Sequence, residues 1–203
     1  MTSGIWEGVK ERRSVRIYRL EEVPTCVLRR ILEAARWAPS AHNAQPWRFV
    51  VLQEHRNKRR LAEAMAQAWD RDLKDDGVPA KLRDGLITES IERFSSPPIV
   101  VIVCKTMEDM ESYPDERRLR AEHTMAVQSV AVSIQNMLLA SHGEGVGACW
   151  FCAPLFCPDV VRETLGIPDG VEPQALITMG RPAERPGPPP RKALESLVHY
   201  ERW

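Results

Sequence analysis

The sequence is short of cysteine, carries no net charge and has no long apolar run, and each of these absences excludes a class of protein. Five Cys in 203 residues are an odd and sparse set, which argues against a disulfide framework. Lys and Arg together number 28, as do Asp and Glu, so the balance argues against a protein whose main work is to coat nucleic acid or an anionic membrane. No apolar run approaches the roughly 20 residues that a membrane span needs.

The N-terminal residues and the composition favour an ordinary globular protein. The segment MTSGIWEGVKERRSVR contains charges but no apolar block and no cleavage site after them, so we expect no secretory signal peptide and a cytoplasmic location. Apolar residues make up 43% and charged residues 28% of the chain, a common balance for a globular domain. At this length we expect a single domain over residues 1–203 with a substantial hydrophobic core.

Several familiar catalytic motifs are missing. There is no Ser nucleophile elbow, no H-E-x-x-H zinc motif and no Walker loop, and the five His residues show no metal-ligand spacing. Gly143, Gly145 and Gly147 match a loose G-x-G-x-x-[GA] pattern, but we expect a helix before them and a strand after them. A dinucleotide-binding fingerprint needs the reverse order, so these glycines are interpreted as a helix stop.

Cys149 and Cys152 form a C-x-x-C pattern that would suit a redox pair or a zinc site. The flanking residues, GACWFCA, are typical of a short buried strand, on which residues three apart point to opposite faces. No second C-x-x-C or pair of His follows to complete a tetrahedral site. We therefore expect Cys149, Cys152 and Cys157 to be plain buried apolar residues.

Apolar periodicity, together with the positions of proline and glycine, predicts a mixture of helices and strands. Strands are expected at residues 47–52, 99–104, 148–153 and 174–179. Helices are expected at residues 5–13, 24–38, 61–69, 122–142 and 159–165, the first with Trp6 and Val9 facing inward. This order suggests an α+β or α/β layered fold. The helix over 122–142 is apolar on more than one stripe, which suits the centre of a domain or a subunit interface.

Four segments are expected to lack regular structure. Residues 40–46 form a polar loop, and residues 111–120 form a polar connection. The charged stretch 70–84 is broken by Gly77 and Pro79 and is interpreted as a mobile surface region. The tail has five prolines between residues 182 and 190, so it is extended and must lie on another surface because it cannot fold on itself.

Two polar clusters are candidates for a binding site. The first gathers Arg12, Arg13, Arg16 and the hydroxyl of Ser14 within five positions, and arginine forks match phosphate oxygens bidentately. The second is the loop from Ser40 to Gln45, whose uncharged donors and acceptors suit the edge of a planar heteroaromatic ligand. The alternatives are a solvated charged face for the first cluster and a turn that caps its own backbone for the second.

Taken together, four short motifs resemble the nitroreductase-type FMN oxidoreductases, in that family's order and spacing. They are Arg12-Arg-Ser-Val-Arg16, Ala38-Pro-Ser-Ala-His-Asn-Ala-Gln-Pro-Trp-Arg-Phe49, Gly145-Val-Gly-Ala-Cys-Trp150 and Gly180-Arg-Pro182, and the resemblance runs from about Glu11 to Trp203. Within the family, Tyr113–Arg118 and Phe156–Gly166 are most similar to the FMN-binding reductase domain of deazaflavin-coenzyme biosynthesis enzymes. Those proteins also carry a glutamyl ligase domain, and that activity does not carry over to this chain.

The resemblance implies an α+β three-layer fold, with a central and mostly antiparallel sheet between helices. It also implies an intertwined homodimer with FMN sites at the interface. The residues that match the contacts to the FMN phosphate and ribityl chain are Arg12, Arg13, Ser14, Arg16 and Arg191. Those that would approach the flavin from the partner subunit are Ser40, His42, Asn43 and Gln45. Those that match the strand and turn against the flavin ring are Cys149, Trp150, Pro154 and Leu155.

The implied activity is transfer of a hydride through FMN by a ping-pong mechanism, from NAD(P)H or a similar donor to a conjugated, nitro or quinone acceptor. A dehydro precursor of the deazaflavin coenzyme is one such acceptor. The Cys-Pro-Asp turn after residue 156 and the charged insert at 70–84 depart from many nitroreductases, and residues 70–94 are the candidate lid over the site. Two alternatives remain open, a flavin-binding storage or sensor protein without turnover and a flavin-destroying synthase.

Overall fold

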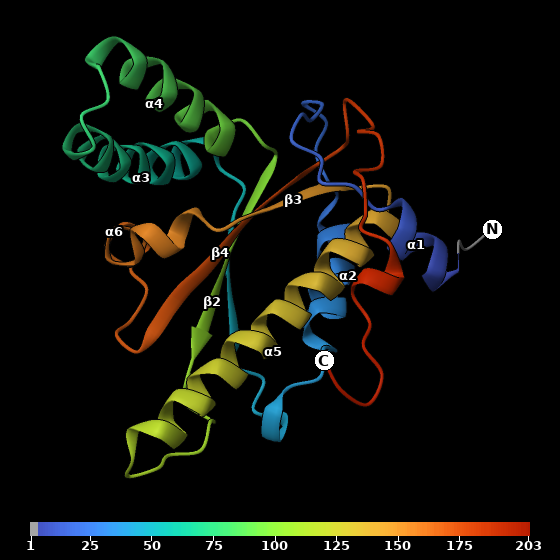
Figure 1. The fold of residues 1–203 in the computed structure, drawn as a ribbon. Coiled ribbons are helices and arrows are strands. Elements are labelled where there is room, and N and C mark those ends of the chain that lie inside the picture. Colours follow the sequence, from blue (N-terminus) through green and yellow to red (C-terminus); the bar gives the residue numbers. More distant parts are fainter. Residues whose placement is uncertain (1–3) are drawn as a thin grey trace.

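A computed structural model describes residues 4–203, and its centre is a four-stranded sheet in the order β1-β2-β4-β3 with every neighbouring pair antiparallel (Figure 1). The strands are β1 (Trp47–Leu52), β2 (Ile99–Thr106), β3 (Gly147–Phe151) and β4 (Val171–Gly180). The α-helices are α1 (Ile5–Glu11), α2 (Thr25–Arg36), α3 (His55–Asp75), α4 (Ala80–Ser95), α5 (Glu116–Gly143) and α6 (Pro158–Leu165). Three short 3₁₀ helices are η1 (Ala41–Asn43), η2 (Ala153–Phe156) and η3 (Leu194–Ser196).

Helices cover both faces of the sheet, which gives the expected three layers (Figure 1). On one face, side chains of α2 and α5 pack against alternate residues of β2 and β4, with Ile31 and Ile134 fully enclosed. On the other face, α3, α4 and α6 pack against the intervening residues, and Leu61 and Val161 lie in that core. Strand β2 is buried along its whole length, as its continuous apolar sequence predicts.

The ends of the helices are set by ordinary capping residues. Pro24 precedes α2 and Pro158 occupies the first turn of α6, where a missing N–H costs nothing. Asp115 accepts a hydrogen bond from the backbone N–H of Arg118 at 3.0 Å at the start of α5. Gly166 ends α6 in the left-handed conformation at φ 66°.

The charged stretch 70–84 is helical rather than irregular, so that expectation is wrong. Helix α3 continues to Asp75, and α4 begins at Ala80, so Gly77 and Pro79 interrupt only one short turn. The Arg83 guanidinium donates to the Asp70 carboxylate at 2.9 Å and ties the two helices together. Charge marked the exposure of this stretch correctly, but it says nothing about backbone order.

Other boundaries and faces also differ from expectation. Helix α5 begins at Glu116, inside the segment expected to be a polar connection, and α3 begins at His55 rather than residue 61. Helix α1 ends at Glu11, and its Trp6 and Val9 are 67% and 48% exposed instead of facing inward. The apolar residues of this helix predict a face that is buried against another surface, but the sequence does not show that the surface belongs to the same chain.

The tail crosses the surface without entering the core. Residues 187–203 are all exposed within the protomer, apart from the short turn η3 they have no regular structure, and Trp203 stacks on His199. The tail was expected to lie on another surface, and the core of the same chain does not bury it. Within residues 4–203, no helix is both long and apolar enough to span a bilayer.

Candidate functional site

The segment that carries the first arginine cluster runs along the outer edge of β3. Ser14 and Ala148 form a parallel bridge, and the backbone N–H of Val15 donates to the Ala148 carbonyl at 3.0 Å. Gly147 permits this approach, because a Cβ at that position would lie 2.8 Å from Val15. Tyr18 fixes the far end of the segment through its hydroxyl, which lies 2.7 Å from Thr178 Oγ1. The arginines are thereby held at one edge of the sheet.

Arginine side chains from both ends of the chain gather at this edge. The pKa of Arg12 is lowered, first by burial and then by the positive charges of Arg191 and Arg13. Arg13 donates to the carbonyls of Lys10 and Arg12, and Arg16 lies over the Phe151 ring at 6.0 Å from its centroid. Among residues 4–203, no carboxylate lies within 4.0 Å of the charged nitrogens of any of these four arginines.

A cleft of about 420 Å³ opens beside this cluster, between the 12–15 segment, the end of α5 and the start of the tail. Arg12, Arg13 and Arg185 line it, and Glu11 also reaches it without pairing with an arginine of the described chain. Like charges gathered in a half-buried place raise the energy of the protein unless an anion joins them. The donor set of guanidinium groups fits a phosphate group, which accepts several such hydrogen bonds.

The strand and turn next to the arginines offer both apolar surface and backbone groups. Trp150 is 37% exposed on β3, and Leu155 is exposed on η2. Cys149 and Pro154 are buried, so their side chains are not placed to contact a ligand in this structure. Burial raises the pKa of the Cys149 thiol, although the nearby Arg16 opposes the shift. The thiol is therefore poorly suited to act as a nucleophile.

The expectation that all three cysteines of this region are buried is only partly correct. Cys149 is buried and Cys157 is half-buried, but Cys152 is exposed because β3 ends at Phe151 and the chain turns into η2. All five cysteines are free thiols. The GACWFCA pattern predicted the strand, but it placed the end of that strand two residues too late.

The second polar cluster lies in a loop with an unusual backbone. His42, Asn43 and Gln45 all have positive φ, at 55°, 55° and 48°, and all three are exposed. His and Asn are among the residues that tolerate this region best, yet each such residue costs of order 1–3 kcal/mol. Ser40 closes the loop by accepting a hydrogen bond from the Gln45 N–H at 3.0 Å. Clusters of strained residues are typical of binding sites.

Within one protomer, the two clusters do not come together. The loop precedes β1, whereas the arginine segment lies beside β3, and β1 and β3 are the opposite edges of the sheet. The loop instead borders a groove of about 1180 Å³ between α2 and β1, which is also lined by Arg29, Arg36 and Arg48. A single site that uses both clusters therefore needs a second copy of the chain.

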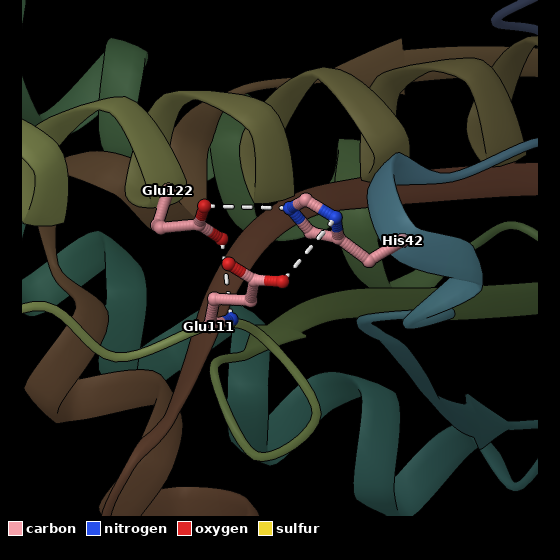
Figure 2. A group of neighbouring side chains, drawn as sticks. All are labelled: His42, Glu111 and Glu122. Carbon is pink, nitrogen blue, oxygen red and sulfur yellow. Dashed lines mark hydrogen bonds and ion pairs between the residues drawn. The ribbon is translucent and has the colours of Figure 1, made fainter.

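The structure adds residues that the sequence motifs did not indicate. Glu122 of α5 is 2% exposed, and its Oε1 lies 3.4 Å from His42 Nε2 (Figure 2). Glu111 faces the other ring nitrogen of His42 at 3.9 Å. One signal in the sequence could have indicated Glu122, since it falls on the same helical face as the buried Ala126 and Val130. A carboxylate in an apolar stripe has to meet a partner.

Comparison with known proteins places the chain in a family. Residues 9–181 match the nitroreductase family. A protein from Methanothermobacter thermautotrophicus named as an NADH dehydrogenase/NAD(P)H nitroreductase is 29% identical over 98% of this chain and 87% of its own length. An NADH dehydrogenase from Thermus thermophilus is 30% identical over 93% of this chain and 91% of its own length.

A solved structure supports the same assignment. The crystal structure of a nitroreductase from Desulfovibrio desulfuricans in complex with FMN superposes with a TM-score of 0.75 at 25% identity, covering 100% of this chain and 99% of the other. The three-layer arrangement predicted from the four motifs is thus confirmed. The chain belongs to the nitroreductase family, whose members are FMN-dependent oxidoreductases.

Proposed function

We propose that this protein binds FMN between two copies of itself and passes a hydride from NAD(P)H to a conjugated, nitro or quinone acceptor. The observation that carries the proposal is the arginine cluster at the β3 edge. Arg12 feels the positive charges of Arg13 and Arg191 there, Arg16 lies on the same segment over Phe151, and none of the four has an acidic partner within ion-pair distance in the described chain. The names of the relatives support NAD(P)H as the donor, and such a donor agrees with the expected cytoplasmic location.

The charge of the phosphate explains why several arginines are needed. A phosphomonoester carries close to two negative charges, and leaving them buried and unpaired would cost several kcal/mol. Arg12 is half-buried and is repelled by the charges of Arg191 and Arg13. A bound anion offsets this repulsion, and the arginines neutralise its charge. Ser14 sits among these guanidinium groups on a backbone fixed to β3, and its hydroxyl adds a neutral donor.

The second copy of the chain supplies the rest of the site in this proposal. Asn43 and Gln45 of the loop from Ser40 to Gln45 are exposed and line the groove between α2 and β1, so they are available to the flavin of a partner. The exposed faces of α1 and the tail are further surfaces that a two-fold partner covers. The intertwined homodimer thus explains several exposed apolar residues at once.

The bound FMN supplies the hydride chemistry, and the protein supplies position, charge and exclusion of water. Trp150 on β3 and Leu155 on η2 expose apolar surface for the flavin ring in this proposal. No side-chain nucleophile is required, which agrees with the raised pKa of Cys149. Donor and acceptor use the same open face in turn, so we expect ping-pong kinetics.

The acceptor is best described by its chemistry, as a planar conjugated molecule. The residues that resemble the deazaflavin-pathway reductases have local roles here, since Asp115 caps α5 and Pro158 begins α6. These roles neither require nor oppose a dehydro precursor of the deazaflavin coenzyme as the acceptor. The assay therefore includes such a precursor beside a nitroaromatic and a quinone.

The test begins with protein purified without added cofactor. We expect a yellow protein with a flavin absorption spectrum and a released ligand with the mass of FMN. Anaerobic addition of NADH or NADPH then bleaches the flavin, and an acceptor restores its colour. A protein that holds FMN but is not bleached by either donor is a storage or sensor protein, and loss of intact flavin during turnover identifies a synthase. Absence of any flavin contradicts the proposal.

A further inference from the structure

The contact between His42 and Glu122 joins the flavin-facing loop to the core. Glu122 lies on the second turn of α5, and its Oε1 is 3.4 Å from His42 Nε2 (Figure 2). Its Oε2 accepts the backbone N–H of Glu111 at 3.3 Å. The imidazole nitrogen and the carboxylate oxygen are complementary hydrogen-bonding groups, so each offers the other a polar partner.

Glu122 has few alternatives to His42. Among residues 4–203, no Lys or Arg nitrogen lies within 4.0 Å of its carboxylate, and the side chain is 3% exposed. A buried carboxylate without donors is costly, so the imidazole and the Glu111 N–H are both needed. The pair is therefore a fixed contact, and it determines which way the His42 ring faces.

The loop that His42 belongs to needs such a contact. Left-handed conformations at His42, Asn43 and Gln45 persist only where the surroundings hold them. Helix α5 holds the loop at two successive residues. The Ala41 N–H donates to Ser129 Oγ at 3.2 Å, and the next side chain, His42, meets Glu122. The His42 ring is 39% exposed and presents one nitrogen to Glu122, and Asn43 and Gln45 are exposed beside it.

We propose that Glu122 is a positioning residue for the flavin site and that it acts through His42. It fixes the loop whose Asn43 and Gln45 approach the flavin of the partner subunit. This inference rests on the proposed function, because it requires that loop to meet FMN. It assigns to a residue outside all four sequence motifs a role in cofactor affinity and in the environment of the flavin ring.

A double-mutant cycle in the FMN-loaded protein tests this proposal. The variants are Glu122→Gln, His42→Gln and the two combined, and the readouts are FMN dissociation on dilution and the visible circular dichroism of the bound flavin. Each single change should weaken FMN binding by about tenfold, and the double variant should be no weaker than His42→Gln alone. The dichroism of flavin-saturated protein should also change, a shift that a loss of fold stability alone does not produce.

Glu116→Gln on the same helix is the matched control, because its side chain is 86% exposed and pairs only with Arg120 in the described chain. Unchanged affinity and dichroism in Glu122→Gln, or additive effects in the double variant, would overturn the proposal. If Glu122→Gln does not fold, His42→Gln is tested alone. Wild-type FMN affinity and wild-type dichroism in His42→Gln would then also overturn the proposal. A wild-type protein without FMN contradicts the proposed function instead, so the two failures are distinguishable.

Discussion

At the scale of single residues, the arginines at the β3 edge differ from most others in this chain. Arg30, Arg59 and Arg83, for example, each meet a carboxylate, whereas Arg12 meets other arginines. Such an arrangement is unfavourable for folding alone. It becomes favourable when an anion occupies the cluster, so the arginines report on binding more than on stability.

Replacing Arg12 and Arg16 together by alanine should release the flavin while the fold survives. The reason is that the cofactor phosphate loses guanidinium donors that make no ion pair in the described protein. We expect FMN affinity to fall by at least about a hundredfold, measured by flavin fluorescence after gel filtration. Arg59→Ala, which removes an exposed pair with Glu63, is the control and should retain FMN. Retention of FMN by the double variant would refute the phosphate assignment.

The buried thiol of Cys104 makes stability depend on alkaline pH. Burial raises the pKa of the Cys104 thiol from 9.0 to about 12. Between these values the unfolded chain releases a proton that the folded chain keeps, so the free energy of unfolding falls as pH rises through this window. The slope from this one group reaches about 1.4 kcal/mol per pH unit.

Urea unfolding between pH 9 and pH 11 measures this effect. Cys104→Ala loses packing at every pH, but its stability should fall less steeply with pH than that of the wild type. Cys26→Ala, which changes an exposed thiol, should keep the wild-type slope. Equal slopes in Cys104→Ala and wild type would show that this thiol is not the source.

At the scale of elements, the α3–α4 hairpin is anchored at one end and free at the other. The base packs through Phe94 against Phe151 of β3, with ring centroids 5.2 Å apart in an edge-to-face arrangement. The turn at residues 76–79 is the other end, and Figure 1 shows the hairpin standing out from the sheet. We propose that the outer end of this helix pair, beyond its buried base, covers the flavin site.

Limited proteolysis tests the hairpin as a lid. We expect cleavage at residues 76–79 to slow several-fold when FMN is bound, because the closed site holds the hairpin down. In Phe94→Ala the base contact is lost, so cleavage should be fast with or without FMN. Equal protection of the wild type in the two states would count against a lid.

Local sequence patterns predicted the elements better than their extents or their neighbours. Strand β1 was predicted over its whole observed length, and β2 was recognised from its apolar run, because both signals lie within the strand itself. Both ends of α3, outside residues 61–69, and the whole of α4 were missed because many of their residues are charged and they cover the core with only one face. Amphipathic periodicity is hard to see where few positions are apolar.

In the candidate site too, residues that are neighbours in the sequence were predicted, whereas contacts between distant residues were not. The arginine cluster and the polar loop are each contiguous in sequence, so motifs were enough to select them. Arg191 was expected by resemblance, and its closeness to Arg12 is now visible. Glu122 could not be assigned a partner from the sequence, because His42 is 80 residues away and meets it only through the fold.

At the scale of the whole molecule, the two clusters lie at opposite sheet edges, so the proposed FMN site has to combine residues of two copies of the chain. A variant without Arg12 and Arg16 and a variant without Asn43 and Gln45 should each be inactive. Mixed and allowed to exchange subunits, they form heterodimers in which one of the two sites is intact. Donor-dependent flavin reduction should then recover to about a quarter of the wild-type rate, since half the dimers carry one good site.

Sedimentation velocity complements that experiment. The mixture should run as a dimer at micromolar concentration, and each variant should do so before mixing. A 23.1 kDa species for the wild type would remove the shared site altogether. No recovery on mixing, despite demonstrated exchange, would show that each protomer builds its site from its own residues.

Gly147 gives the protein a vulnerable point that stability measurements would overlook. Where the N-terminal segment passes β3, one added carbon would meet Val15 at 2.8 Å, and the segment makes fewer backbone hydrogen bonds to β3 than β4 does. Gly147→Ala should leave β3 paired with β4 but push residues 12–16, which carry the arginines, outward from β3. Gly147→Ala protein should therefore fold and accumulate like the wild type but contain no FMN, and so be colourless and inactive.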